Sequence, residues 1–449
     1  MLLPACRGCS RLLGVMAMTN LFGHSVRSDL LALFLAEGLA CFGAFYLILS
    51  LGAPGASAQV DLAAFAALLA LCAGLIAGAT GLYQPERWLR ANRLAAGTML
   101  GAVVLLGITH VLFPTIGSAS WAAQAALVAS FVLSITFTRI AFAAARRSGF
   151  MRPRLVLVRA ATAGAEDGNS AFFDVAGVAT PDTLTVERVR AMRASLVVAD
   201  ARGLVAPDLA GQLAEAGISV LDRAEFIERA TGRVDFATLA PDWLASARGA
   251  QDHRLEAFVR RSLDIALGVA LLLFTFPLLV ATALAIKLDS PGPVFYRQER
   301  VGKGGRPYTL FKFRSMRTDA EATGAPVWAT QQDARVTRVG RFIRLTRIDE
   351  IPQVFNVLKG DMAFVGPRPE RPGFVEKLAA VIPHYDDRHC VKPGITGWAQ
   401  VNYPYGASVE DARQKLAYDL YYVRRRSLFL DLLIIVATVR VVLFQEGSR

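Results

Sequence analysis

The sequence predicts a membrane protein of mixed class. We expect an N-terminal four-helix transmembrane bundle, a degenerate Rossmann-like α/β domain, and a C-terminal α/β-containing region entered through a re-entrant membrane helix. Two observations lead to this prediction. Apolar residues make up 54% of the 449 residues and charged residues only 19%, against about 25% charged residues in soluble domains. The apolar residues also gather in long runs early in the chain and in short runs later, and these patterns are typical of spans and of buried strands.

Four apolar stretches in the first third are long enough to cross a bilayer, at 30–51, 62–83, 94–113 and 121–145. Arginines occupy the tail before the first stretch, the link after the second and the segment after the fourth, whereas the other two links hold neither Lys nor Arg. By the positive-inside rule, residues 1–150 form a cytoplasmic tail and four spans, and everything after residue 146 is cytoplasmic. We expect no charge inside the cores of these spans, which disfavours a transporter.

Residues 151–250 are predicted to form the α/β domain. Short apolar runs at Leu155–Val158, Leu196–Ala199 and Ile218–Leu221 suit buried parallel strands with helices between them. A dinucleotide-binding fold would place GxGxxG after the first strand, but residues 159–164 read RAATAG. The pattern favours a scaffold or dimerisation role over NAD binding.

A further apolar run, at about 262–287, is flanked by Arg260, Arg261 and Lys287 and contains Pro277. Both flanks therefore look cytoplasmic, and the proline removes one helix hydrogen bond in mid-run. We expect a re-entrant helix that bends at Pro277 and returns. The alternative, an ordinary fifth span, would move the last third of the chain across the membrane.

The next informative stretch is a basic stripe that ends at Asp349-Glu350. Arginine recurs at every third position from 335 to 347, which aligns the side chains along a helix. We expect Asp349 to cap the following helix, where the arginines and the helix dipole depress its pKa and keep it an ionised nucleophile. Glu350 beside it suits a divalent metal. An Asp-Glu pair near arginines is, by itself, more typical of a salt-bridged surface.

Neighbouring segments of the sequence support a phosphate-binding site around Asp349 and Glu350. Pro367 and Pro369 bracket Arg368, which suits a guanidinium held towards a phosphate. Residues 290–316 are predicted to form two strands around a glycine-rich turn, without a P-loop motif, and their basic residues, among them Lys312 and Arg314, suit phosphates or lipid headgroups. Residues 392–398, KPGITGW, form a tight loop.

Residues 256–449 resemble the bacterial sugar transferase family, the polyprenyl-phosphate phosphoglycosyl transferases with one re-entrant helix. The matching pieces, in chain order, are Gln298-x-Arg300-x-Gly302, Lys312–Met316, Arg344 with Asp349-Glu350, Asn356–Pro369, Lys392–Asn402 and Tyr418–Val423. With four spans and an α/β domain in front, the chain resembles the long members that initiate exopolysaccharide or O-antigen repeat units.

This resemblance implies a catalytic domain on the cytoplasmic face of the bacterial inner membrane. It would move a sugar 1-phosphate from a UDP-sugar to undecaprenyl phosphate and release UMP. Asp349 would form a phosphosugar intermediate and Glu350 would hold Mg²⁺. The implied phosphate- or substrate-binding residues are Arg300, Lys312, Arg314, Arg344, Arg368 and Asp419.

The resemblance also implies a bilayer partner and a homodimer, and no nucleic acid despite the net charge of +12. One departure concerns the helix break, where many members have Ser-Pro and this chain has Phe276-Pro277. We expect Thr275 to bond a carbonyl that the proline frees.

Two other functions stay open. A membrane-tethered nucleotide-sugar dehydratase or epimerase requires the glycine motif and a Tyr-x-x-x-Lys pair. Tyr308 and Lys312 match that spacing, but they fall in a predicted strand, so we interpret the match as chance. A non-enzymatic scaffold for polysaccharide assembly predicts that replacing Asp349 leaves function intact.

Overall fold

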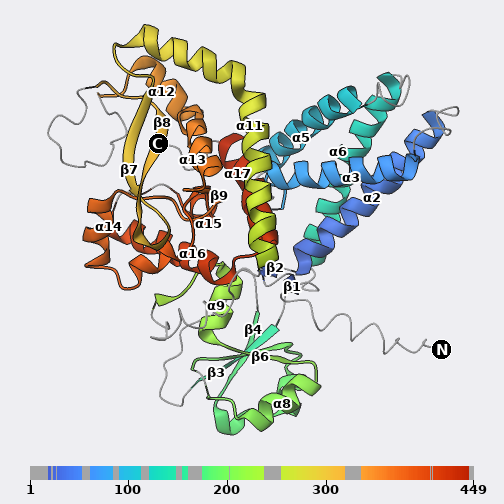
Figure 1. The fold of residues 1–449 in the computed structure, drawn as a ribbon. Coiled ribbons are helices and arrows are strands. Elements are labelled where there is room, and N and C mark those ends of the chain that lie inside the picture. The colour runs from blue at the N-terminus through green and yellow to red at the C-terminus, as the bar shows by residue number, and fades with distance from the viewer. Residues whose placement is uncertain are drawn as a thin grey trace. The chain divides into compact units, whose positions relative to one another are not determined.

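The chain divides into two compact units, Met1–Thr231 and Gly232–Arg449 (Figure 1). The computed structural model describes residues 19–21, 24–26, 28–52, 61–83, 91–112, 121–147, 154–159, 174–201, 203–236, 254–318, 335–404, 406 and 408–443. The tail arginines Arg7, Arg11 and Arg27, the predicted basic link at Arg87 and Arg90, and the turn after the first predicted strand lie outside these residues.

The first unit contains a bundle of apolar helices. They are α2 (Ser28–Gly52), α3 (Leu62–Ala79), α5 (Ala91–Leu112) and α6 (Trp121–Arg147). Their shared core is built from large apolar side chains such as Phe45. The four predicted spans are confirmed as long apolar helices, and among the described residues these four and α11 are long and apolar enough to cross a membrane.

The bundle also buries an ion pair, so the expectation that its helices carry no charge in their cores is wrong. Arg139 Nη1 on α6 lies 2.8 Å from Glu37 Oε1 on α2, and both side chains are almost fully buried. Tyr83 and Thr138 donate hydrogen bonds to the same carboxylate, at 2.7 and 2.8 Å. Each buried charge is compensated by its partner. The argument against a transport role, which rested on uncharged helix cores, therefore does not hold.

The first unit also contains a four-stranded parallel sheet in the order β4-β3-β5-β6. The strands are β3 (Arg154–Val158), β4 (Asp174–Ala179), β5 (Leu196–Ala199) and β6 (Ser219–Asp222). The connecting helices are η3 (Pro181–Thr183), α7 (Val186–Ala191), α8 (Pro207–Glu215) and α9 (Arg223–Thr231). The first strand of this sheet in chain order, β3, lies inside the sheet, as in doubly wound folds.

The three predicted strands of this sheet are confirmed, and one strand was missed. Strand β4 reads DVAGVA and lies at the edge of the sheet, where most of its side chains are half-buried. Small residues and partial burial leave no continuous apolar run, so its sequence carries no strong strand signal.

The second unit begins with the long helix α11 (Arg254–Asp289), which contains Pro277. Figure 1 shows that this helix changes direction sharply along its length instead of running straight. Because proline lacks an N–H, it cannot bond to the carbonyl of Leu273. Thr275 Oγ1 donates instead to Leu271 O at 2.6 Å. The expectation that Thr275 bonds the freed carbonyl is therefore wrong. The hydroxyl bonds the carbonyl four residues before Thr275, that of Leu271, and not the freed carbonyl of Leu273.

Both halves of α11 contact the same folded unit. Before the proline, Arg261 donates to the carbonyls of Val357 and Leu358, each at 2.6 Å. After it, Ile286 is buried in a cluster with Phe313 and other residues. The two ends of the helix are thus anchored on one globular body.

The remaining elements of the second unit follow α11 in the chain. Strands β7 (Phe295–Val301) and β8 (Pro307–Phe313) form the predicted antiparallel hairpin, joined by η5 (Lys303–Gly305). Next come α12 (Arg338–Leu345), η6 (Ile348–Gln353), α13 (Val354–Lys359) and β9 (Ala363–Val365). Of these, α12, α13 and β9 contact α11. The chain continues with α14 (Pro372–Ala379), η7 (Tyr385–Cys390), β10 (Gly394–Thr396), α15 (Trp398–Asn402), α16 (Val409–Arg425) and α17 (Leu428–Leu443).

Candidate active site

Asp349 and Glu350 lie in the first turn of η6, directly after a reversal of the chain. Helix α12 ends at Leu345, and Arg347 adopts a left-handed conformation with φ 59°. Arg347 therefore occupies the cap position, and the expectation that Asp349 caps the helix is wrong. The reversal falls two residues earlier than predicted, which moves both carboxylates from the cap into the turn itself.

Glu350 is held by three cationic side chains. Its Oε1 lies 2.6 Å from Arg368 Nη2, 3.2 Å from Lys312 Nζ and 3.7 Å from Arg347 Nη1. Burial by itself raises the pKa of this carboxyl, but the charges of Arg368 and Lys312 outweigh burial and hold the pKa of Glu350 well below its ordinary value. The paired cations therefore favour the ionised form of Glu350.

Asp349 has the opposite environment. Its side chain is 8% exposed, and its buried Oδ1 has no hydrogen-bond partner among the described residues. Burial and the neighbouring charge of Glu350 raise the pKa of Asp349 to about 6, against the weaker effects of Lys312 and Arg344. The prediction of a depressed pKa is wrong, because the cations of the site pair with Glu350. The ionised form of Asp349 still predominates at neutral pH, and its free oxygen is poorly solvated.

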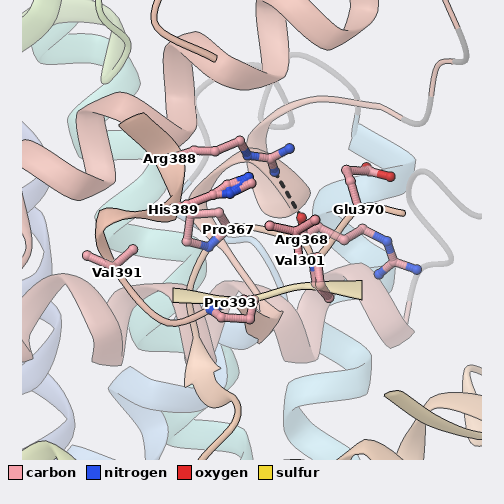
Figure 2. Close-up of a pocket in the computed structure, with 10 residues that line it drawn as sticks. Val301, Pro367, Arg368, Glu370, Arg388, His389, Val391 and Pro393 are labelled. Carbon is pink, nitrogen blue, oxygen red and sulfur yellow. Dashed lines mark hydrogen bonds between the residues drawn. The ribbon is translucent and has the colours of Figure 1, made fainter. Parts of the chain in front are cut away.

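Arg388 holds the loop that carries Arg368 by a hydrogen bond to the backbone of that loop. Arg388 Nη2 donates to the Arg368 carbonyl at 2.9 Å (Figure 2). The same nitrogen pairs with Asp419 Oδ2 at 2.7 Å. Asp419 is 2% exposed, and burial raises its pKa to about 6 despite the opposing charge of Arg388. The structure thus gives Asp419 an indirect connection to the site, through Arg388. Sequence reasoning missed Arg388, which lies in no recognised motif.

Glycines let the backbones of two segments, VGPRP and KPGITG, come into close contact at this loop. A Cβ at Gly366 would lie 2.3 Å from Lys392 O, one at Gly394 would lie 2.1 Å from Gly366 N, and one at Gly397 would lie 2.2 Å from Gly366 O. Only glycine permits such close approach. The glycines of the VGPRP and KPGITG segments therefore fix the position of Arg368.

Arg300 approaches the same loop from strand β7. Its Nη1 donates to Pro369 O at 3.0 Å, and its Nη2 donates to Gln298 Oε1 at 2.6 Å. Burial lowers the pKa of Arg300, partly against the charge of Glu370. A tight cavity of about 10 Å³ lies here, with walls that include Val301, Arg368 and Arg388 (Figure 2).

The structure brings together most, but not all, of the predicted site residues. Lys312, Arg368 and Glu350 are in direct contact, and Arg344 acts on Asp349 through its charge. Arg314 has a different role, because its guanidinium donates to the carbonyls of Ile286, Ser290 and Pro291 at the end of α11. It is 5% exposed and anchors the membrane helix.

The donor set suits a metal only together with a ligand. Among the described residues, no group of three or more His, Cys, Asp or Glu side chains is placed to hold an ion. Mg²⁺ is commonly held by one or two carboxylates plus substrate phosphates and water. The adjacent carboxylates of Asp349 and Glu350, one with an unpartnered oxygen, fit that arrangement.

Comparison with known proteins relates the second unit to a characterised group. Residues 255–445 match the profile of the family described as bacterial sugar transferase. The chain is 46% identical over 266 residues to a UDP-N-acetylgalactosamine-undecaprenyl-phosphate N-acetylgalactosaminephosphotransferase of Aeromonas hydrophila, covering 58% of this chain and 61% of the relative.

Two further relatives match within shorter segments. A UDP-glucose:undecaprenyl-phosphate glucose-1-phosphate transferase of Xanthomonas campestris pv. campestris is 48% identical over 187 residues, 41% of this chain and 39% of the relative. A putative undecaprenyl-phosphate N-acetylgalactosaminyl 1-phosphate transferase of Bacillus subtilis is 55% identical over 130 residues, 29% of this chain and 72% of the relative. The match thus spans less than two thirds of the Aeromonas and Xanthomonas proteins.

Proposed function

The chain belongs to the bacterial sugar transferase family, and from this premise we propose that it moves a sugar 1-phosphate from a UDP-sugar to undecaprenyl phosphate and releases UMP. The observation that carries the proposal is the adjacent carboxylate pair, in which Glu350 pairs with the cations and the buried Asp349 keeps an oxygen without a hydrogen-bond partner among the described residues. The names of the relatives support this reaction. It would start a glycan repeat unit such as that of an exopolysaccharide.

The chemistry proceeds in two displacements. A carboxylate oxygen of Asp349 attacks the phosphorus that carries the sugar, and the bond from that phosphorus to the bridging oxygen breaks. UMP leaves with this oxygen and its electron pair. An oxygen of the lipid phosphate then attacks the same phosphorus, and the bond to Asp349 breaks. The products are the polyprenyl diphosphate sugar and a restored carboxylate.

The positive charges of the site can stabilise the phosphate groups during both displacements. Arg368 and Lys312 lie against Glu350, where they can shift towards the phosphate oxygens of an arriving donor. Arg300 and Arg344 add positive charge nearby. Arg388 and Asp419 act as positioning residues, because they hold the backbone of Arg368.

Glu350, together with Asp349, would hold Mg²⁺ beside the donor phosphates. Such an ion supplies charge neutralisation on the departing phosphate.

The membrane arrangement is part of the proposal. Both halves of α11 are anchored on one folded body, so a helix that enters the bilayer and returns satisfies both anchors, whereas a straight span does not. With α2, α3, α5 and α6 as full spans, both termini and the catalytic domain lie on the cytoplasmic face of the inner membrane. The enzyme works there as a homodimer without nucleic acid.

The test of the reaction uses the purified full-length protein, Mg²⁺ and undecaprenyl phosphate. A panel of donors should include UDP-glucose and UDP-N-acetylgalactosamine, because the relatives are named for these sugars. We expect UMP release with at least one donor, and retention of the labelled sugar phosphate on the protein when lipid is omitted. If no donor in a complete UDP-sugar panel gives UMP or a lipid-linked product, the proposal fails.

The test of topology uses a reporter joined after Arg449. A reporter that is active only in the cytoplasm should be active in this fusion, and one that is active only outside should be silent. The reverse result would exclude both the four-span arrangement and the re-entrant helix.

A further inference from the structure

A second, larger cavity shares the wall residues Val301 and His389 with the tight cavity beside Arg368. It is a cleft of about 420 Å³ between the β7–β8 turn, helix α14 and η7. This volume falls within the range of small-molecule sites, about 300–1,000 Å³. Its walls include Gly305 from the turn, Val375 and Glu376 from α14, and Asp386 and His389 from η7.

The cleft is continuous with the surroundings of Arg368. Val301 and His389 line both this cleft and the tight cavity beside Arg368. Figure 2 shows these two side chains next to Arg368 and Arg388. Arg368 in turn contacts Glu350. A ligand bound through its phosphates at Arg368 could therefore extend its other end past His389 into the cleft.

The walls of the cleft suit an uncharged, hydroxyl-bearing group and not a phosphate. Val301 and Val375 offer apolar surface for a flat ring. Glu376 and Asp386 carry exposed carboxylates, which repel phosphate but accept hydrogen bonds from ribose hydroxyls, as acidic residues do in dinucleotide sites. The two ends of a nucleoside diphosphate thus meet opposite charges, cationic at Arg368 and anionic in the cleft.

His389 adds a polar group that lacks a partner. Its Nε2 is buried and has no hydrogen-bond partner in the part of the chain that the structure describes. Burial and the charge of Arg388 lower the pKa of His389 to about 4, so the ring is neutral at physiological pH. A neutral imidazole can exchange one hydrogen bond with an uncharged base edge, and a buried polar atom left unpaired costs about 1–3 kcal/mol.

We propose that this cleft binds the nucleoside end of the donor, with the uracil ring between Val301 and Val375 near His389 and the ribose hydroxyls at Glu376 and Asp386. The inference rests on the proposed function for the identity of the donor. It deepens that function because it separates nucleotide recognition from the phosphate chemistry at Asp349 and Arg368.

The test compares two exposed neighbours on α14, of which only the first lines the cleft. Glu376→Trp fills the cleft from its rim, whereas Lys377→Trp places the same side chain elsewhere on the helix. For Glu376→Trp we expect the KM for UDP-sugar and the inhibition constant for UMP to rise at least about 10-fold, which corresponds to about 1.4 kcal/mol. The KM for undecaprenyl phosphate should stay unchanged. Lys377→Trp should match the wild type in all three constants.

Equal constants for the two variants, in an enzyme that does release UMP, would overturn the cleft assignment and leave the proposed function intact. A measurement that needs no turnover complements this one. 5-Iodo-UMP is photo-cross-linked to the wild-type protein and the modified peptide is identified. An adduct within residues 372–390 supports the cleft, even if no transfer is found, and an adduct confined to other segments overturns it.

Discussion

The parallel sheet of the N-terminal unit and the Asp349 region of the C-terminal unit differ in where their charged side chains lie. Strand β5 buries all four of its apolar residues, and the charges at the strand ends pair near the surface, as Asp200 does with Arg223, which is 48% exposed. Around Asp349, the charges themselves are buried, with Asp419 at 2% and Arg388 at 7%. Burying charge costs free energy unless the charges are paired. A region that retains such groups is therefore where chemistry is expected.

The largest expected effect comes from removing the nucleophile. Asp349→Asn should lower turnover by at least about 10³-fold and abolish retention of labelled sugar phosphate on the protein, because an amide cannot attack phosphorus. The matched control is Asp200→Asn in the parallel sheet, which should leave the rate of UMP release unchanged. Full activity in Asp349→Asn would instead favour the scaffold hypothesis.

Loss of the cation that pairs with Glu350 should have a smaller effect. Arg368→Ala should lower kcat/KM by about 10²-fold, as expected when one charge-stabilising donor is lost. The comparison is Arg223→Ala, which removes the half-exposed ion pair of the sheet and should leave kcat/KM within twofold of the wild type. If the two arginine variants behaved alike, the charges around Asp349 would have no greater effect on the reaction than a surface ion pair of the sheet. The measurement is UMP release at varied donor concentration.

The pH dependence should reflect the raised pKa of Asp349. Because the ionised form is the nucleophile and burial together with Glu350 raises its pKa to about 6, activity requires deprotonation. UMP release without lipid should be nearly constant above pH 7, and should fall about 10-fold for each unit well below pH 6. Circular dichroism over the same range checks that the fold persists. A rate that stays constant down to pH 4.5 would contradict the raised pKa.

The smallest effect concerns the stability of the C-terminal unit, where its first residues join its core. Val234 is 5% exposed in the core of the C-terminal unit, its N–H donates to Ala417 O at 3.0 Å, and Trp398 Nε1 donates to Gly232 O at 2.6 Å. Val234→Ala should lower the free energy of unfolding by about 1–3 kcal/mol. Val178→Ala, on the edge strand at 51% exposure, should change it by less than about 0.5 kcal/mol.

The same contacts predict which N-terminal truncation gives the more stable protein. All of the recognised motifs lie beyond residue 250, so a chain that begins at residue 251 is expected to retain some catalysis. It lacks Gly232 and Val234, however, and a chain that begins at Gly232 keeps them. We expect the longer chain to show the higher melting temperature and the higher specific activity when both are measured in the same detergent. Equal values would show that the segment is dispensable.

Local patterns in the sequence predicted the four N-terminal helices, three strands of the parallel sheet and the β7–β8 hairpin, and they singled out the Asp349-Glu350 pair. Runs of apolar residues predicted the four N-terminal helices because their signal is contained within each segment. Edge strand β4 escaped prediction because its burial depends on neighbouring strands. The Glu37–Arg139 pair was missed for a related reason, since its partners are 102 residues apart.

Within the candidate site, the sequence by itself determined which residue types are present and where the backbone must be tight, as at Gly366 and Pro367. Only the tertiary structure decided how the charges are shared. Lys312 and Arg368, 38 and 18 residues away, both pair with Glu350, so Asp349 is left buried with a raised pKa. Desolvation and charge pairing depend on distances between segments remote in the chain, and a local pattern of residues contains no information on those distances.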